Sequence, residues 1–230
     1  MSRLRVATYN LHSGIGLDRR FRPQRILDVI GELDADIIAL QEVLSPVFGV
    51  DVHEHLRAET GFHLATMTTM QLAGGTFGNA VLSRWPIVER VDHSLAVGDY
   101  EPRGALECVV GLGRSRLRVI ATHLGLRSAE RRWQIERLVE IARSNSDVPT
   151  VLAGDLNARR ARSRELKACI EYFGSAAAPN TFPSIAPVLP LDRVFVLPGV
   201  MLMKVEAHRS RRARIASDHL PLLATIELPD

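Results

Sequence analysis

Short apolar runs of strand length recur along the whole of this chain and alternate with only a few helix-like segments. Breaks at Gly, Pro or Arg separate many of these runs, so each run predicts a β-strand. The predicted strands span residues 4–11, 37–43, 62–70, 78–84, 86–94, 105–113, 116–124, 150–157, 191–196, 201–207 and 220–228. Many strands with few interleaved helices predict two packed sheets flanked by helices.

Four segments are interpreted as helices, and they span residues 23–33, 50–61, 129–144 and 163–173. Pro23 suits the first turn of the first helix. In the third helix, Ser128 is placed to cap the N-terminus, and Trp133, Leu138 and Ile141 are expected to face the core. The remaining segments, including the basic stretch after residue 207, are predicted to be loops.

The composition is that of an ordinary globular protein. The 230 residues are 46% hydrophobic and 24% charged, and a chain of this length buries a substantial core without disulfides. No internal repeat or long linker divides it, so residues 1–230 are interpreted as one domain, and a monomer is expected.

The two cysteines and the N-terminus bear on the compartment. Cys108 and Cys169 lie in apolar segments and are expected to be inert core thiols in a reducing environment. The first residues pass directly into a predicted strand, and no stretch reaches the roughly 18 apolar residues of a membrane helix. The sequence therefore predicts a cytoplasmic protein with no transmembrane segment.

Arginines are clustered, although the formal net charge is only +3. The clusters lie beside predicted turns or helix starts, in "LDRRFR", "LRSAERR", "NARRARSR" and "HRSRRAR". Solvated surface charge explains many of them. Such clusters also suit an anionic partner, which is a nucleic acid, a lipid head group or a phosphorylated metabolite.

Polar side chains lie at the ends or starts of six of the predicted strands. They are Asn10, Glu42, His123, Asp155 with Asn157, Asp192, and Asp218 with His219. If the strand over 150–157 continued to its end, Asp155 and Asn157 would share one face, because side chains two apart in a strand point the same way. A turn explains any one of these residues, since Asp and Asn favour turns. Their recurrence at several strand edges favours a ligand site at a rim of the sheets.

The order of the motifs resembles that of a known superfamily. The segments "TYN", "QEV", "GNAVLSRWPI", "THLGLR", "GDLN", "LDRVFV" and "SDHLP" extend from Asn10 to His219. Together they resemble the endonuclease/exonuclease/phosphatase superfamily, the group similar to deoxyribonuclease I, and above all its short bacterial members. The resemblance implies an α/β fold, a four-layered α/β/β/α sandwich of two packed mixed sheets flanked by helices. The active site is then expected at the top of the two sheets.

The resemblance also implies a metal site. Glu42 is the expected primary ligand, with Asn10 beside it and Asp218 in or near the metal shell. Oxygen ligands and a phosphate substrate fit Mg²⁺ or Mn²⁺, which are hard cations. The sequence does not decide between one metal and two.

Five further residues receive catalytic roles from the resemblance. Asp155 and Asn157 are expected to position the attacking water and the phosphoryl oxygens. His219 is expected to act as general base or as electrostatic partner of the phosphate, with Asp192 holding its ring in one tautomer. His123 is expected to contact the phosphate or assist the leaving group.

Three more residues are expected to contact the substrate phosphate, namely Asn79, Arg103 and Arg211. Arg211 lies in "HRSRRAR", which leads directly into "SDHLP" and is therefore predicted to stand at the rim of the site. The deoxyribonuclease-like relatives have a glutamate on the strand that corresponds to "TFGNAVL", and this chain has no acid there. That difference leaves the acid–base role of His123 open. His12 is equally well explained as a member of the site or as a loop residue.

The function expected from these observations is hydrolysis of a P–O bond by in-line attack of water. The preferred substrate is a phospholipid or a small phosphorylated compound, because aromatic residues are only 5% of the chain and the loops are short. A metal-dependent nuclease acting on DNA is the alternative, and the basic segment around Arg211 favours it. A catalytically dead binding module is disfavoured by the joint presence of the carboxylates and His219.

Overall fold

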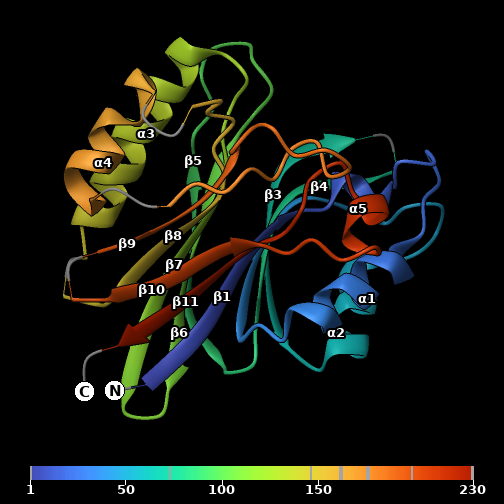
Figure 1. Ribbon diagram of the computed structural model, residues 1–230, viewed down its shortest axis with the longest axis horizontal. Helices are drawn as coiled ribbons and strands as arrows, with labels where there is room; N and C mark the ends of the chain where they lie inside the picture. Colours follow the sequence, from blue (N-terminus) through green and yellow to red (C-terminus); the bar gives the residue numbers. More distant parts are fainter. Residues whose placement is uncertain are drawn as a thin grey trace.

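The structure, a computed structural model, contains two β-sheets packed face to face (Figure 1). It describes residues 2–72, 74–145, 147–160, 163–174, 177–197 and 199–228. The six-stranded sheet runs in the order β10 (Met201–Ala207), β11 (Leu222–Leu228), β1 (Ser2–Asn10), β2 (Ile37–Ser45), β4 (Gly75–Ser83), β3 (His63–Leu72). The five-stranded sheet runs in the order β5 (Ile87–Ser94), β6 (Gly104–Leu112), β7 (Ser115–His123), β8 (Thr150–Asp155), β9 (Asp192–Val196).

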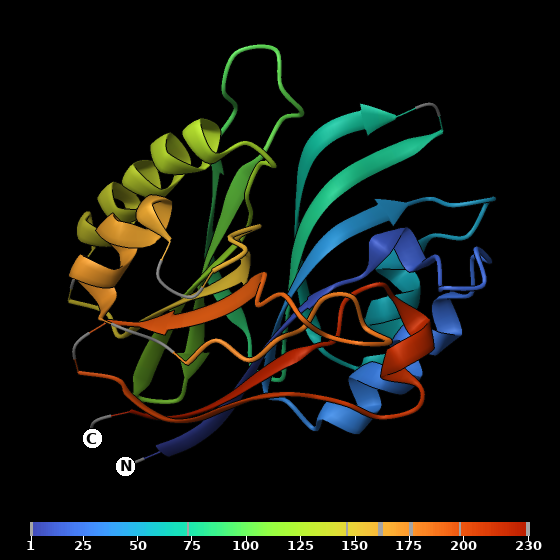
Figure 2. The same cartoon turned by 45° about the horizontal axis from the view of Figure 1, so that its top comes forward.

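Helices cover the outer face of each sheet, which gives four layers (Figure 2). On the six-stranded sheet lie α1 (Pro23–Leu33), α2 (Val52–Thr60) and the short α5 (Ala213–Ala216), and the 3₁₀ turn η1 (His12–Gly14) precedes α1. On the five-stranded sheet lie α3 (Ser128–Arg143), the 3₁₀ turn η2 (Arg164–Leu166) and α4 (Lys167–Phe173). The α/β/β/α sandwich with two mixed sheets is confirmed, because β1–β2 and β7–β8 pair in parallel and the other pairs are antiparallel.

The core explains why the central strands read as continuous apolar runs. In β2, Ile37 and Ala39 face the opposite sheet, whereas Ile38 and Leu40 face α1 and α2. A strand buried on both faces needs apolar residues at every position rather than at alternate ones. Both cysteines are buried and unpaired, as predicted. No helix among the described residues is long and apolar enough to cross a membrane.

Three local predictions are wrong. Trp133 is 45% exposed, because the buried face of α3 runs through Gln134, Leu138 and Ala142 and leaves Trp133 beside it. The N-cap of α3 is Arg127 rather than Ser128, which is the first helical residue. The basic segment after residue 207 is not all loop, since it contains α5.

The strand register assembles the functional edge. Asn10 pairs with Gln41 at the carboxyl ends of β1 and β2. In the other sheet His123 pairs with Asp155, and Asp155 pairs with Asp192 at the start of antiparallel β9. Both sheets therefore end in polar side chains at the same edge, where ligands bind in such sheets.

Candidate active site

The polar strand ends of both sheets meet in one open cavity of about 460 Å³. This volume falls within the range of small-molecule sites. The lining residues are Glu42, Phe77, Glu101, Arg103, His123, Leu126, Asp155, Asn157, Arg159, Phe182, Leu189, Leu191, Asp218 and His219. The edge predicted from the strand ends is thus a real cavity.

Asp155 lies at the centre of the polar cluster and is almost fully buried. Its Oδ2 accepts a hydrogen bond from Asn10 Nδ2 at 3.2 Å. The same oxygen lies 3.5 Å from His123 Nε2 and 3.6 Å from His219 Nε2. One carboxylate oxygen therefore faces two imidazole rings, one from the end of β7 and one from the segment before β11.

His219 is held by a second buried carboxylate. Its Nδ1 lies 2.9 Å from Asp192 Oδ2, and that oxygen also accepts a hydrogen bond from Thr181 Oγ1 at 2.5 Å. Burial lowers the pKa of His219, but the negative charges of Asp192, Asp155 and Asp218 outweigh it and raise the pKa to about 10. The ring is therefore charged at neutral pH, and Nε2 is the nitrogen left to face Asp155.

His123 has the opposite electrostatics. Arg103 Nη1 donates to its Nδ1 at 2.9 Å. Burial lowers the pKa of His123 to about 3, and the charges of Arg103 and His219 add to that effect against the opposing charge of Asp155. The ring is thus neutral at physiological pH, which argues against a role as a charged proton donor to the leaving group.

The prediction that Asp155 and Asn157 share one strand face is wrong. Strand β8 ends at Asp155, and Asn157 adopts a left-handed backbone conformation with φ of 51°. Its backbone N–H donates to Asp155 Oδ1 at 2.8 Å, and its Nδ2 donates to the carbonyl of Leu124 at 2.9 Å. A turn built on the Asp155 side chain thus brings Asn157 to the cavity. The pair therefore forms a turn and also belongs to the site.

Glu42 extends into the site from an irregularity in β2. The pairing of β2 with β4 shifts register between Leu40 and Val43, and Glu42 itself has a φ of 54°. Asn10 Nδ2 donates to its Oε1 at 2.9 Å. Burial and the charges of Asp218 and Asp155 raise the pKa of Glu42 despite that hydrogen bond.

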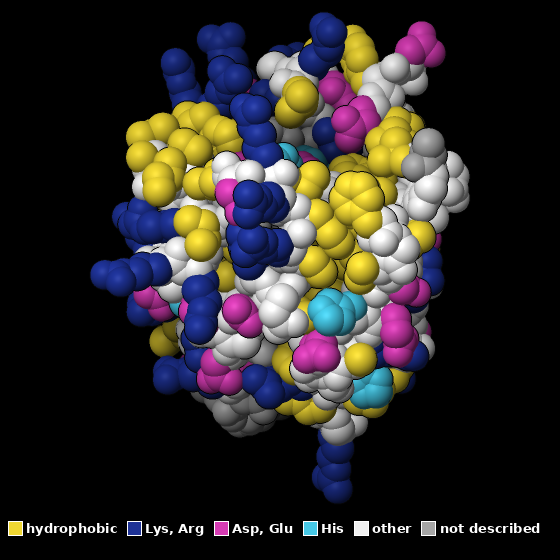
Figure 3. Space-filling model, turned by 90° about the vertical axis from the view of Figure 1, so that its right-hand side faces the viewer, with side chains coloured by type: hydrophobic (Ala, Val, Ile, Leu, Met, Phe, Trp, Pro, Cys, Tyr) yellow, Lys and Arg dark blue, Asp and Glu magenta, His cyan; other side chains and the backbone are white. Residues whose placement is uncertain are grey.

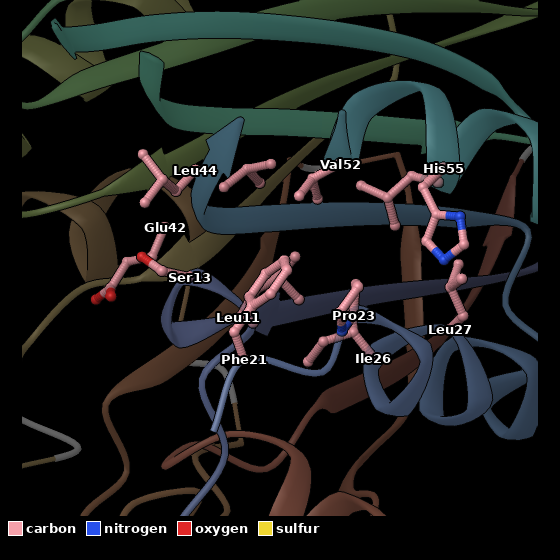
Figure 4. A pocket seen from close by; sticks show the side chains of 13 residues that line it. Leu11, Ser13, Phe21, Pro23, Ile26, Leu27, Glu42, Leu44, Val52 and His55 are labelled. Carbon is pink, nitrogen blue, oxygen red and sulfur yellow. The ribbon is translucent and has the colours of Figure 1, made fainter. Parts of the chain in front are cut away.

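An apolar pocket of about 10 Å³ lies behind Glu42 and has room for little more than one water. Figure 4 shows the Glu42 carboxylate pointing away from this pocket, whose walls include Leu11, Phe21 and Leu44. The stem of Glu42 is therefore held against an apolar wall while its charged end turns to the polar cluster.

The site fits a hard divalent cation on the chemistry of its donors. Glu42 lies near Asp155 and Asp218, and mutual repulsion of these carboxylates is one cause of its raised pKa. Carboxylate and amide oxygens are the ligands that Mg²⁺ and Mn²⁺ prefer. Ligand atoms of a second buried group, Asp155, Asp192 and His219, lie within 4.8 Å of one another. Asp192 Oδ1 in that group has no hydrogen-bond partner among the described residues.

The three residues expected to contact the substrate phosphate are placed differently. Arg103 lines the cavity and forms an ion pair with Glu101 at 3.1 Å. Asn79 is buried and donates to the carbonyl of Gly104 at 3.0 Å, and Arg211 is exposed in the turn before α5. Neither of these two is among the residues that line the cavity.

Arg159 and His12 also lie at the site. Arg159 lines the cavity and is not among the site residues predicted from the sequence, although its place two residues after Asn157 in "GDLNAR" indicates it. His12 lies at the border of the site, with its Nδ1 3.0 Å from the carbonyl of Ile15 and 3.9 Å from Asp218 Oδ1.

Comparison with known proteins agrees with this geometry. The model of the Endonuclease/Exonuclease/phosphatase family matches residues 7–219. The chain belongs to this family. Members of the Endonuclease/Exonuclease/phosphatase family are phosphoric ester hydrolases and are generally dependent on a divalent metal.

One curated relative and two solved structures extend the comparison. Escherichia coli "Uncharacterized protein YbhP" is 32% identical over 244 residues, covering 97% of this chain and 96% of its own. A mannosyl-6-phosphatase of Bacteroides thetaiotaomicron has a TM-score of 0.77 at 18% identity, over 98% of this chain and 100% of its own. TDP2 of D. rerio, in complex with a single-strand DNA product, has a TM-score of 0.76 at 17% identity, over 99% of this chain and 100% of its own. Both structures share the fold.

Proposed function

We propose that this protein hydrolyses a phosphoric ester with the help of a bound divalent metal ion. The observation that carries the proposal is the position of Asp155, whose Oδ2 faces His219 Nε2 and His123 Nε2 at the floor of an open cavity. A buried carboxylate between two rings of different charge is suited to hold a water beside an anionic phosphoryl group.

Asp155 is the proton acceptor in this proposal. His219 is charged and so has no free nitrogen to receive a proton, whereas the Asp155 carboxylate does. His219 instead places positive charge beside the phosphoryl oxygens, where charge develops in the transition state. Asp192 orients the ring through the 2.9 Å contact at Nδ1.

Glu42, Asp218 and Asn10 would hold the metal, Mg²⁺ or Mn²⁺. These are the oxygen donors of the cluster that are not committed to His219. When bound, the ion supplies positive charge that polarises a phosphoryl oxygen and stabilises the leaving oxygen.

Arg103 and Asn157 are the proposed phosphate ligands, since both line the cavity and carry donors. His123 acts as the neutral support of Arg103, which donates to it at 2.9 Å. Asn79 is proposed to support Arg103 indirectly. Its amide donates to the carbonyl of Gly104, the residue that follows Arg103. Arg211 is proposed to act outside the cavity and not on the scissile phosphate.

We propose a phospholipid or a small phosphorylated compound as substrate, acted on by a monomer in the cytoplasm. Two arginines of "HRSRRAR" are engaged, Arg212 with Glu32 at 3.1 Å and Arg214 with the carbonyl of Ile185 at 2.6 Å. That engagement weakens the case for a nuclease, although one relative of the same fold binds a DNA product.

A substrate screen tests the proposal. The purified protein is assayed with Mg²⁺ and with Mn²⁺ on bis-p-nitrophenyl phosphate, phosphoinositides, glycerophospholipids, and supercoiled and abasic DNA. We expect metal-dependent turnover of the soluble diester and a lipid, and loss of both in Asp155→Asn. Turnover of DNA alone would make the protein a nuclease. If no ester is hydrolysed with either metal, the protein is a binding module rather than an enzyme.

A further inference from the structure

An apolar band on the surface has no role in the site described above. It consists of Leu17, Phe48, Ile185, Val188 and Ile215, which are 42%, 90%, 56%, 66% and 47% exposed. These side chains come from four segments far apart in the sequence, namely the loop before α1, the loop after β2, the connector before β9, and α5. Large apolar side chains that are exposed together on one face indicate an interaction surface.

Contacts between these segments hold them side by side. The backbone N–H of Leu17 donates to the carbonyl of Ile215 at 3.1 Å. Arg214, next to Ile215, donates to the carbonyl of Ile185 at 2.6 Å. At the other end, the ring of Phe48 packs edge-on against the ring of Phe21, with 5.9 Å between the ring centroids. The backbone of Phe21 in turn forms an isolated β-bridge with Ile15. The four segments that carry the exposed apolar side chains are therefore neighbours in space.

Arginines stand beside the band. Arg19, Arg20 and Arg22, from the motif "LDRRFR", are exposed and form no ion pair among the described residues. The acid of that motif, Asp18, is already paired with Arg25. Figure 3 shows dark-blue side chains between yellow areas on the face that carries α1, α2 and α5. The face therefore combines apolar surface with arginines that form no ion pair among the described residues.

The band borders the mouth of the cavity. The connector that carries Ile185 and Val188 also supplies Phe182 and Leu189 to the cavity wall. A flat partner that covers the band would therefore lie next to the opening.

We propose that the apolar band, with Arg19, Arg20 and Arg22, docks the protein on an anionic lipid bilayer. Apolar side chains beside arginines match the interfacial region of such a bilayer, where aliphatic groups insert and basic groups meet lipid phosphates. A DNA duplex would meet the arginines but offers no apolar surface to Phe48 or Val188. A second copy of this chain would bury the apolar side chains but would bring the same arginines against each other.

Docking at this face would hold the cavity mouth at the membrane surface. It narrows the substrate to a phospholipid head group, and this step alone rests on the proposed function. Docking itself requires neither the metal nor hydrolysis.

Vesicle binding tests the docking without reference to catalysis. The protein is sedimented in EDTA with vesicles of phosphatidylcholine plus phosphatidylglycerol, and with vesicles of phosphatidylcholine alone. We expect binding to the anionic vesicles only. Phe48→Ser/Val188→Ser should weaken it about tenfold or more, and Arg20→Ser/Arg22→Ser about fivefold for each charge removed. The matched control is Val88→Ser/Arg114→Ser, two exposed residues at the opposite end of the sheets, which should bind as wild type.

Several outcomes would overturn the proposal. If all variants bind anionic vesicles equally, or if the wild-type protein does not bind them, this face is not a membrane-docking surface. A dimer in light scattering that Phe48→Ser/Val188→Ser dissolves assigns the band to a second copy. Duplex DNA binding that depends on the arginines alone, without vesicle binding, assigns the face to nucleic acid.

Turnover of bis-p-nitrophenyl phosphate separates docking from catalysis. Both surface variants should hydrolyse this soluble diester as wild type does, while losing activity on vesicle lipid. Vesicle binding by a protein that hydrolyses no ester would keep the docking and reject the proposed function.

Discussion

His219 and Asp192 are joined by a 2.9 Å contact between Nδ1 and Oδ2, although 26 residues separate them in the chain. Asp192 opens β9 in one sheet, and His219 precedes β11 in the other. The contact therefore links the two sheets at the edge that carries the cavity. Asp192 reaches the cavity only through the ring that it holds, since it is fully buried and does not line the wall.

This linkage predicts non-additive losses of activity. His219→Ala should lower kcat by about 10³-fold, within the range for acid–base and electrostatic groups, and Asp192→Asn should cause part of the same loss. The double variant should be scarcely slower than His219→Ala, because the two residues act as one unit. Single-turnover rates on a soluble diester make the measurement, and costs that multiply would show that the residues act independently.

Glu42 is expected to determine metal affinity. Glu42→Gln keeps the shape of the side chain but removes the charge that holds a hard cation, so Mg²⁺ should bind about tenfold or more weakly. Titration calorimetry measures this binding directly, and circular dichroism checks that the fold is intact. The control is Glu101→Gln, which removes a carboxylate of the same cavity that is paired with Arg103. Unchanged Mg²⁺ affinity in Glu42→Gln would remove Glu42 from the ligands.

The fold was predictable because two signals agree along the chain. Apolar runs marked the strands, and the ordered motifs from Asn10 to His219 placed their polar ends in one family's arrangement. What failed was local geometry that depends on tertiary contacts. Trp133 lies one position from the buried face of α3. The pattern of apolar residues does not determine the orientation of the helix about its own axis to within one residue.

In the site, too, the general arrangement was predictable and the local geometry was not. Residue types at strand ends predicted which side chains meet, but not how each reaches the cavity. Asn157 reaches it through a left-handed turn. Arg211 lies outside it, in the turn before α5, where the neighbouring Arg212 pairs with Glu32 of α1. Proximity in sequence to Asp218 could not reveal that contact, since its partner residue lies 180 positions away.

Glu107 predicts how stability depends on pH away from the site. Burial raises its pKa, but the hydrogen bonds from Arg118 at 2.6 Å and His93 at 2.8 Å outweigh burial, and the net pKa is lowered. A carboxyl with a lowered folded-state pKa adds stability above its unfolded value, near 4.5, and loses that contribution as the pH falls through the folded value.

Glu107→Gln should therefore flatten the fall in stability on the acid side of about pH 5. It should also cost about 3 kcal/mol at neutral pH, because it leaves the fully buried Arg118 without its carboxylate. Urea denaturation at several pH values measures both effects. The control, Glu89→Gln, removes an exposed partner of Arg116 and should change stability by less than about 1 kcal/mol. An unchanged pH slope in Glu107→Gln would contradict the assignment.

Asn157 allows the turn and the site to be tested separately, because its left-handed backbone and its amide serve different ends. Asn157→Ala loses the amide and also strains the backbone, so it should cost roughly 1–2 kcal/mol of stability as well as activity. Asn157→Gly loses the same amide and its hydrogen bond to Leu124, but glycine tolerates φ of 51°, so this variant should lose less stability than Asn157→Ala while its activity falls as far. Urea denaturation and turnover of a soluble diester are measured on both variants. If Asn157→Gly keeps full activity, Asn157 serves only the turn, and the phosphate contact proposed for its amide is wrong.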